Sequence, residues 1–490
     1  MFGKFSRRHF AKLAGFSALG MAATPAKSED VEAKQAPDRH VPASFPSGFI
    51  WGTATSAFQI EGAVSEDGRG RSIWDTFAHT PGKIGDHSNA DRANDHYHRY
   101  KEDVRLIKEL GVRAYRFSIA WPRVFPDGTN APNPKGLDFY NRLLDELLAN
   151  GIEPFVTLYH WDLPQSLQDR FGGWQSSDTS GAFANYAGYV AERLSDRVKS
   201  FFTVNEVGRF VNFGYGAGID APGLTLSQAK LNQVRHNVAL AHGLAVQAIR
   251  ARARAGTKVG PAENIAACLP AIETPANIRA AEIATRELNA GFLNVILEGK
   301  YTDAFLEYAG NDAPKYTAAE LKIISSPIDF VGLNIYAPQF YVVATDRAPG
   351  FDVLPFPASF PHMNSEWLRI GPETAYWVPR LAAKVWNIDT IYISENGTSG
   401  ADKPAADGKV YDLDRIMYLR NYLTQLQRAT SEGVPVRGYF LWSLMDNFEW
   451  IYGFEQRFGL YRVDFDTQLR TPKLSVSFYR DVVARNAIGA

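Results

Sequence analysis

The sequence predicts an α/β protein that folds as a single (β/α)8 TIM barrel, with long loops after the strands forming an active-site pocket. From Phe45 onward, eight strand-like apolar runs alternate with amphipathic helical patterns. Two of these runs end on a glutamate, Glu206 and Glu395. A parallel barrel presents functional groups at the carboxyl ends of its strands, so both the alternation and the placement of the acids favour this fold.

The eight expected strands lie at residues 49–57, 114–121, 153–161, 201–206, 258–266, 329–336, 390–395 and 437–445. Helical periodicity between them is clearest at residues 93–110 and 228–251. The longest connection, residues 337–373, is rich in proline and aromatic side chains. A compact domain seldom keeps such a loop without a use for it, so we expect this one to wall the pocket.

Length and composition fit one large globular domain. The chain has 490 residues, of which 45% are hydrophobic, and α/β barrels of this size need not divide in two. A net charge of −1 does not indicate a nucleic acid or an acidic membrane surface as a partner. The single cysteine, Cys268, excludes an intrachain disulfide and is expected to be a small buried residue. No cofactor is expected, and the sequence does not reveal the oligomeric state.

The first 26 residues are typical of a bacterial twin-arginine signal peptide. Arg7 and Arg8 precede a short apolar run at residues 13–23, which is too short to span a bilayer. We expect cleavage after Ala26, a disordered linker at residues 27–44 and one folded domain at residues 45–490. The mature protein would then be periplasmic or secreted, with no membrane insertion. A disordered basic N-terminus is the alternative interpretation.

The two strand-end glutamates suggest a reaction. Glu395 lies in the stretch IYISENG, where Asn396 and Gly397 favour a sharp turn, and Glu206 ends the stretch FFTVNE. Each alone could be a strand-capping residue. Two carboxylates on two strand ends of one barrel can face each other across a sugar, which is the arrangement that glycoside hydrolysis requires.

From residue 45 to residue 483 the chain resembles glycoside hydrolase family 1, the retaining β-glucosidases. The resemblance rests on stretches that occur in the family's order, namely FPSGFIWGTATSAFQIEGA, DHYHRYKEDV, YRFSIAWPRVFP, TLYHWDLP, TVNE, DFVGLNIY, ISENG, LWSLMDNFEW and RFGLYRVDFDTQLRTPK. It implies a retaining exo-β-glucosidase that removes terminal β-D-glucosyl residues from a small glycoside, with fucosides and galactosides as further substrates. A transglucosylase and a non-catalytic sugar-binding barrel are the alternatives.

The resemblance also assigns catalytic roles. It implies that Glu395 is the nucleophile and Glu206 the acid/base, supported by Arg116, Asn334 and Tyr336. A retaining mechanism needs the two carboxyl groups about 5 Å apart, one ionised and the other protonated. Their environments must therefore differ. Arg116 and Tyr336 are expected beside Glu395, where a guanidinium and a phenol would stabilise the carboxylate.

Sugar recognition is implied for a further set of polar and aromatic residues. Asn205 is expected to hold the 2-hydroxyl, Glu449 to accept from two neighbouring hydroxyls and Trp442 to offer an apolar face. The assignment of Trp367 rests on a more divergent loop. The full set expected to bind substrate is Gln59, His160, Trp161, Asn205, Trp367, Trp442, Glu449 and Trp450.

Several residues depart from the family's pattern. Val207 stands where proline usually follows the acid/base, and Asp220 stands where the family usually has a histidine. The position of the paired histidine on the following helix reads Arg235-His236. We expect these changes to alter the preference for the leaving group, not to abolish the reaction. His96 and His98 are two residues apart on an expected helix, so their rings point in different directions and no metal site is expected there.

Overall fold

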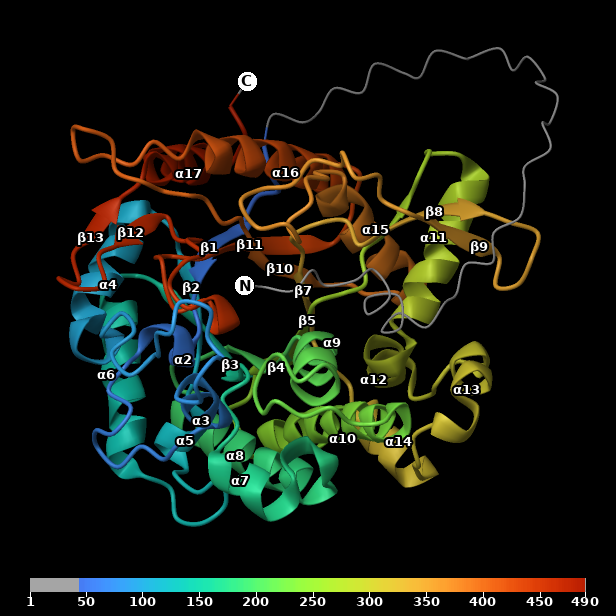
Figure 1. Ribbon diagram of the computed structural model, residues 1–490, viewed down its shortest axis with the longest axis horizontal. Coiled ribbons are helices and arrows are strands. Elements are labelled where there is room, and N and C mark those ends of the chain that lie inside the picture. Colours follow the sequence, from blue (N-terminus) through green and yellow to red (C-terminus); the bar gives the residue numbers. More distant parts are fainter. Residues whose placement is uncertain (1–43, 490) are drawn as a thin grey trace. The chain divides into compact units, whose positions relative to one another are not determined.

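The computed structural model describes residues 44–489 of the chain, and the expected signal peptide lies outside the described residues. Within them, eight parallel strands close into a barrel in the order β1-β11-β10-β7-β5-β4-β3-β2, with helices connecting the strands (Figure 1). The predicted (β/α)8 fold is confirmed. The barrel strands are β1 (Ile50–Ala54), β2 (Ala114–Ser118), β3 (Glu153–Tyr159), β4 (Ser200–Asn205), β5 (Lys258–Glu263), β7 (Val331–Asn334), β10 (Ile391–Asn396) and β11 (Val436–Trp442).

The helices fall into long ones that cover the barrel and short ones in the loops. The long ones are α4 (His96–Leu110), α6 (Pro134–Ala149), α8 (Ser177–Leu194), α10 (Gln228–Arg252), α11 (Pro275–Leu288), α15 (Thr374–Trp386), α16 (Leu413–Ser431) and α17 (Leu474–Arg485). The short ones are α2 (Ala57–Ile60), α3 (Ile73–Ala78), α5 (Trp121–Val124), α7 (Gln165–Phe171), α9 (Val207–Phe210), α12 (Val295–Glu298), α13 (Asp303–Ala309) and α14 (Ala318–Ile324). The helices expected at residues 93–110 and 228–251 correspond to α4 and α10.

Most strands end earlier than the sequence pattern suggested. The run expected at residues 258–266 leaves the sheet after Glu263, and the run expected at 437–445 leaves it after Trp442. In the opposite direction, β10 continues one residue beyond Glu395, so the turn does not begin directly after that carboxylate. Apolar residues continue past the strand ends because the loops above the barrel are themselves packed.

The connection at residues 337–373 carries secondary structure that the sequence pattern does not predict. It contains β8 (Phe340–Ala344) and β9 (Phe351–Leu354), which pair antiparallel. A third strand, β6 (Cys268–Pro270), pairs parallel with β8 and completes a small separate sheet. Cys268 is buried in it, as predicted.

Aromatic rings fill the barrel below its carboxyl ends. The ring of Phe155 on β3 lies 4.9 Å from that of Phe440 on β11 and 5.5 Å from that of Tyr392 on β10, measured between centroids. In the barrel β3 is adjacent to neither β11 nor β10, so these rings meet in its interior. They form a rigid floor on which polar side chains at the strand ends can rest.

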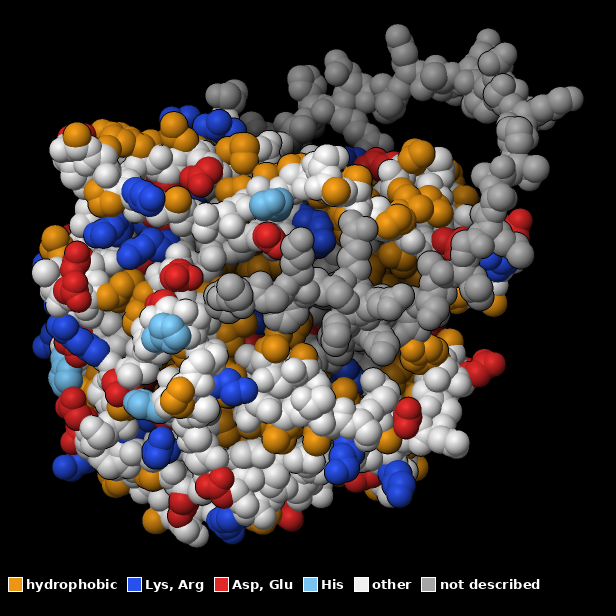
Figure 2. All heavy atoms as spheres, viewed as in Figure 1, with side chains coloured by type: hydrophobic (Ala, Val, Ile, Leu, Met, Phe, Trp, Pro, Cys, Tyr) orange, Lys and Arg blue, Asp and Glu red, His pale blue; other side chains and the backbone are white. Residues whose placement is uncertain are grey.

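The described surface carries mixed charge. On the face that Figure 2 shows, Lys and Arg side chains lie among Asp and Glu side chains, and no broad area of one sign is visible. This pattern agrees with the net charge of −1. Across residues 44–489, no helix has both the length and the apolar character needed to cross a membrane.

Candidate active site

Glu395 lies near the carboxyl end of β10 and is 4% exposed. Each of its oxygens accepts one hydrogen bond from a fixed donor. Arg116 Nη1 donates to Oε1 at 2.6 Å, and Tyr336 Oη donates to Oε2 at 2.7 Å. Burial and the charge of Glu395 raise the pKa of Tyr336 well above its usual value, so the phenol keeps its proton for this bond. One cationic and one neutral donor therefore fix both oxygens of this buried carboxylate.

The guanidinium of Arg116 is held on several sides. Its Nε donates to Thr157 Oγ1 at 3.1 Å, and its Nη1 also donates to the carbonyl of Ser394 at 3.0 Å. The group lies 5.0 Å from the centroid of the Phe202 ring, over one of the rings that floor the site. Arg116 is therefore preorganised, and its charge is fixed against Glu395.

Glu206 follows β4 and is buried in a different environment. Its only hydrogen-bond partner among the described side chains is Asn334, whose Nδ2 donates to Oε1 at 2.8 Å. Burial, followed by the charge of Glu395, raises the pKa of Glu206 to about 7. The two carboxyl groups thus differ as a retaining mechanism requires, because one has a cationic donor and the other has a neutral amide.

Two asparagines connect these carboxyl groups. Asn205 Oδ1 accepts from Arg116 Nη2 at 2.7 Å and from Asn334 Nδ2 at 3.1 Å. Ser394 Oγ donates to Asn334 Oδ1 at 2.7 Å, which fixes the orientation of that amide. A continuous chain of hydrogen bonds therefore runs from Glu395 through Arg116, Asn205 and Asn334 to Glu206. The structure brings together all five residues predicted to carry or support the reaction.

His160 presents an unused ring nitrogen. Asn205 Nδ2 lies 3.2 Å from Nε2 of His160 and donates to it, and burial holds the pKa of the imidazole well below its usual value. The neutral ring then carries its proton on Nδ1, which is buried and has no hydrogen-bond partner among the described residues. A sugar hydroxyl could accept this proton. The ring stacks 5.6 Å from Trp442, which places that indole beside it.

Gln59, Glu449 and Trp450 form a second group, in which the ring centroid of Trp450 lies 6.0 Å from that of His160. Gln59 Nε2 donates to Asn447 Oδ1, to the carbonyl of Phe448 and to Glu449 Oε2, at 2.9, 2.9 and 3.2 Å. Gln59 therefore holds the loop that carries Glu449. Burial raises the pKa of Glu449 to about 8, against the opposing influence of Arg209. Trp450 is 4% exposed, and its ring centroid lies 4.4 Å from that of Trp161.

Trp367 lies at the rim. It is 40% exposed, and its ring lies 5.8 Å from that of Tyr336, the phenol that donates to Glu395. Its position is compatible with contact to a leaving group.

The departures from the family's pattern introduce an ion pair that the sequence did not predict. Arg209 Nη2 lies 3.2 Å from Asp220 Oδ2, and the guanidinium stacks 4.0 Å from the centroid of the Phe213 ring. The charge of Arg209 opposes the rise in the pKa of Glu206 and in that of Glu449, so its electrostatic field reaches the site. By contrast, the ring of His236 is buried, and its Nδ1 forms a hydrogen bond with Tyr301 Oη at 2.9 Å.

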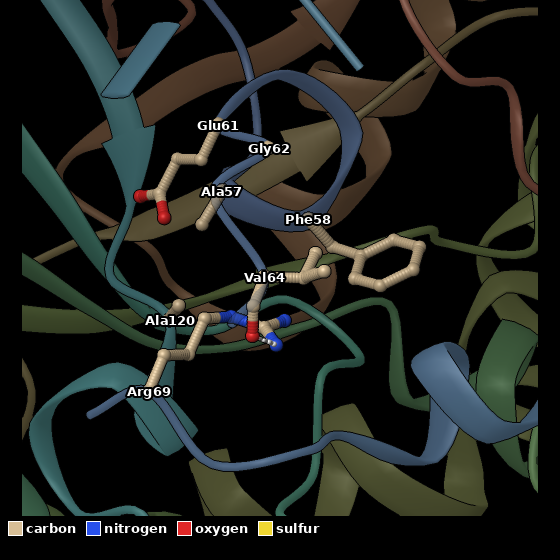
Figure 3. Close-up of a pocket in the computed structure, with 7 residues that line it drawn as sticks. All are labelled: Ala57, Phe58, Glu61, Gly62, Val64, Arg69 and Ala120. Carbon is tan, nitrogen blue, oxygen red and sulfur yellow. Dashed lines mark hydrogen bonds between the residues drawn. The ribbon is translucent and has the colours of Figure 1, made fainter. Parts of the chain in front are cut away.

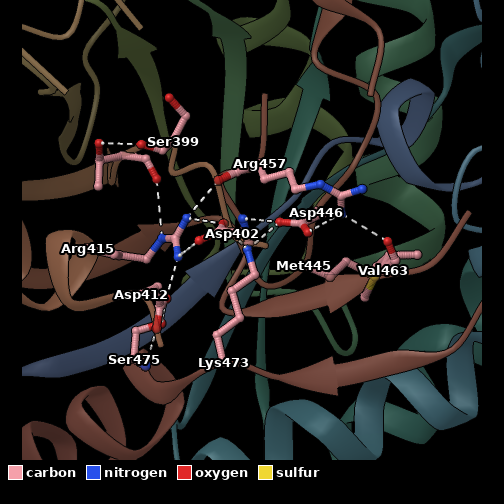
Figure 4. Close-up of polar contacts among 12 residues, drawn as sticks. Ser399, Asp402, Asp412, Arg415, Met445, Asp446, Arg457, Val463, Lys473 and Ser475 are labelled. Carbon is pink, nitrogen blue, oxygen red and sulfur yellow. Dashed lines mark hydrogen bonds and ion pairs between the residues drawn. The ribbon is translucent and has the colours of Figure 1, made fainter. Parts of the chain in front are cut away.

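A buried ionic network holds the loop that carries Glu449 (Figure 4). Lys473 Nζ contacts Asp446 Oδ1 at 2.6 Å and Asp402 Oδ2 at 2.5 Å, and Arg457 Nη1 donates to Asp446 Oδ2 at 2.7 Å. Arg415 pairs with Asp402 on the other side. Removing one partner from such a network leaves a buried unpaired charge, which typically costs about 3–5 kcal/mol. The loop after β11 is therefore firmly anchored.

A small pocket beside α2 does not belong to the site (Figure 3). Glu61 and Arg69 are its charged lining residues, and both are already paired. Glu61 accepts from Arg123 Nε at 2.9 Å and from Tyr140 Oη at 2.7 Å, while Arg69 pairs with Asp75 at 2.9 Å. The contacts of Glu61 fix the residue that directly follows α2, the helix that carries Gln59, whereas the Arg69–Asp75 pair joins the next loop to α3.

The His96 and His98 rings have separate partners. His96 Nδ1 lies 2.8 Å from Asp103 Oδ2, whereas His98 contacts Asp95 and Glu66. In the part of the chain that the structure describes, no group of three or more His, Cys, Asp or Glu side chains is arranged to hold a metal ion.

Comparisons with known proteins all point to one family. Residues 41–488 match the model of Glycosyl hydrolase family 1. Beta-glucosidase A of Acetivibrio thermocellus is 44% identical over 450 residues, covering 90% of this chain and 99% of that protein. A 1,4-beta-D-glucan glucohydrolase of Thermotoga neapolitana is 42% identical over 445 residues, covering 91% and 99%. The solved family 1 b-glucosidase from Thermotoga maritima superposes with a TM-score of 0.83 at 41% identity, covering 91% and 99% of the two chains.

Proposed function

The chain belongs to glycosyl hydrolase family 1 and is a retaining β-glucosidase, and on this premise we propose that Glu395 is its nucleophile and Glu206 its general acid and base. The observation that carries the proposal is the contrast between the two linked carboxyl groups. Glu395 accepts from a guanidinium and a phenol, whereas Glu206 accepts from one amide and has a raised pKa. The raised pKa of Glu206 favours the protonated form that a general acid needs.

In the first half of the reaction, Glu395 attacks the anomeric carbon of a terminal β-glucosyl residue. Glu206 gives its proton to the glycosidic oxygen as the bond to the leaving group breaks. Arg116 and Tyr336 hold the attacking carboxylate in position. The product is an α-linked glucosyl ester on Glu395 together with the released alcohol or sugar.

In the second half, the same pair works in reverse. The ester carries no negative charge, so the repulsion by which Glu395 raises the pKa of Glu206 disappears. Glu206, having given up its proton, now stays ionised more readily and takes a proton from water as that water attacks the anomeric carbon. Glucose leaves with its β configuration retained, and Glu206 is protonated again.

Substrate selection rests on the pocket side chains. His160 can donate from Nδ1 to a hydroxyl, and Glu449 can accept from hydroxyls. Asn205 uses Oδ1 for Arg116 and Asn334 and one N–H for His160, which leaves its second N–H for the 2-hydroxyl. We assign the apolar face of the sugar to Trp442, which stacks against His160.

We expect wild-type protein to release glucose from cellobiose, with kcat/KM falling as the pH rises through about 7. This limb reports Glu206, because only its protonated form can assist the leaving group and its pKa is raised to about 7. The measurement is glucose release from cellobiose between pH 4 and 9. Release of fucose and galactose from the corresponding β-glycosides is measured in parallel. Release of only one glucose per cellobiose consumed, with the other glucosyl group found on an acceptor, would favour a transglucosylase. Binding of glucosides without any turnover would contradict the assignment.

We further propose that the protein is exported through the twin-arginine route. The support is the Arg7-Arg8 pair followed by a short apolar run. In a bacterial host with this export system, activity of the full chain is expected in the periplasmic fraction, and the double change R7K/R8K is expected to leave it in the cytoplasm. Equal periplasmic activity for both proteins, or none for the wild type, would refute the proposal.

A further inference from the structure

Glu263, the last residue of β5, places its carboxylate on the backbone directly after Glu206. The N–H of Val207 donates to Oε2 at 2.9 Å, and the N–H of Gly208 donates to Oε1 at 3.0 Å. Glu263 is 4% exposed, and these two amides are the only hydrogen-bond donors found for its carboxylate among residues 44–489. A buried carboxylate is thus committed to two backbone groups beside the general acid.

Those two amides need such a partner. Val207 and Gly208 open α9, and the first N–H groups of a helix have no acceptor within it. The residue at the N-cap usually supplies one, but here the N-cap is Glu206, whose side chain makes no capping bond and faces Asn334 instead. Glu263, from the neighbouring strand, supplies the acceptors that the Glu206 side chain does not provide.

The backbone of Glu206 also needs external support. Its φ of 53° and ψ of 61° lie in the left-handed region, which costs a residue with a side chain about 1–2 kcal/mol. The N–H of Glu206 donates to the carbonyl of Ala262 at 2.9 Å, and the two following N–H groups reach Glu263. The end of β5 therefore holds this strained residue on both sides.

We propose that Glu263 is a positioning residue for the general acid, fixing the backbone that aims the Glu206 carboxyl group at the glycosidic oxygen. This inference rests on the proposed role of Glu206. It also explains why an N–H at residue 207 is useful in this chain, since proline there would offer none. Burial raises the pKa of Glu263 to about 8, while the N–H groups of Gly208 and Val207 oppose this rise and the charge of Glu206 adds to it.

The test compares Glu263→Gln with the wild type on two substrates of different leaving-group ability. The amide keeps the size of the side chain but can accept only one of the two bonds. For cellobiose, whose leaving group needs a proton, kcat/KM is expected to fall on the order of 10- to 100-fold, as small misplacements of catalytic groups do. For 2,4-dinitrophenyl β-glucoside, which needs no acid, it is expected to fall less than about 3-fold.

Val207→Pro provides a second variant that keeps the carboxylate and removes one donor. Proline is tolerated at the first position of a helix, so folding should survive. It is expected to reduce kcat/KM for cellobiose selectively, and to add little in the Glu263→Gln background. Asp329→Asn is the matched control, because Asp329 accepts from the Val259 N–H at 2.7 Å near the amino end of the same strand. It should leave the ratio of the two kcat/KM values unchanged.

Equal losses on both substrates, or no loss on cellobiose, would overturn the inference. Glu206→Ala separates this failure from a failure of the proposed function. If Glu206→Ala shows selective loss on cellobiose and both Glu263→Gln and Val207→Pro do not, only the role of Glu263 is refuted. If Glu206→Ala itself loses activity equally on both substrates, the role of Glu206 is wrong.

Discussion

Replacing Glu395 by glutamine is expected to lower kcat for every β-glucoside by on the order of 10⁴-fold or more. The amide keeps the size of the side chain and can still accept from Arg116 or Tyr336, so the pocket should retain its shape. It has no carboxylate to attack the anomeric carbon. The loss should be the same for poor and activated leaving groups, because both need the nucleophile.

The measurement is kcat on 4-nitrophenyl β-glucoside, with thermal unfolding to verify the fold. Glu153→Gln is a suitable control, since Glu153 is an exposed glutamate at the amino end of β3, away from the carboxyl ends where Glu395 lies. It should keep wild-type activity. A Glu395→Gln protein that folds and retains more than about a hundredth of wild-type kcat would mean that another group attacks the sugar.

Replacing Glu206 by alanine is expected to have the second largest effect, and a substrate-dependent one. Loss of the general acid should lower kcat/KM for cellobiose on the order of 10²- to 10⁴-fold. With 2,4-dinitrophenyl β-glucoside the first step needs no acid, so kcat/KM should change little. Its kcat should nevertheless fall, because no base remains to activate water against the ester on Glu395.

Azide should restore turnover of the Glu206→Ala variant on the dinitrophenyl substrate. A small anion can attack the glucosyl ester without a base, and the cavity left by the side chain gives it access. The expected product is β-glucosyl azide, since azide would enter from the face that Glu206 serves. Formation of α-glucosyl azide, or no acceleration by azide, would contradict the assignment of Glu206.

The barrel was predictable because its signal is repeated along the chain. Its strands are short apolar runs, and amphipathic helical patterns lie between most of them, most clearly at α4 and α10. The small sheet of β6, β8 and β9 was not predictable, because β8 pairs with a segment far away in sequence and is only partly buried. Its residues have no regular alternation that would separate them from a packed loop.

The site divides in the same way. Glu206 and Glu395 stand out because each ends an apolar run, and the family resemblance supplied Arg116, Asn334 and Tyr336. Glu263 was missed because the strand around it was expected to continue to residue 266, which placed Glu263 inside the strand. A charged residue within an apolar run was the available signal that the strand ends there. The pairing of Arg209 with Asp220 depends on the folded loop and left no sequence pattern.

Trapping the covalent intermediate tests the central claim most directly. A 2-deoxy-2-fluoroglucoside with an activated leaving group should react with the protein and leave it labelled. The fluorine slows both formation and hydrolysis of the glucosyl ester, but the activated leaving group speeds formation alone, so the ester accumulates. The account predicts that mass spectrometry finds one fluoroglucosyl group per chain, on Glu395 in the peptide containing residues 391–397. A label on a different residue, or inactivation of the Glu395→Gln variant at the wild-type rate, would contradict it.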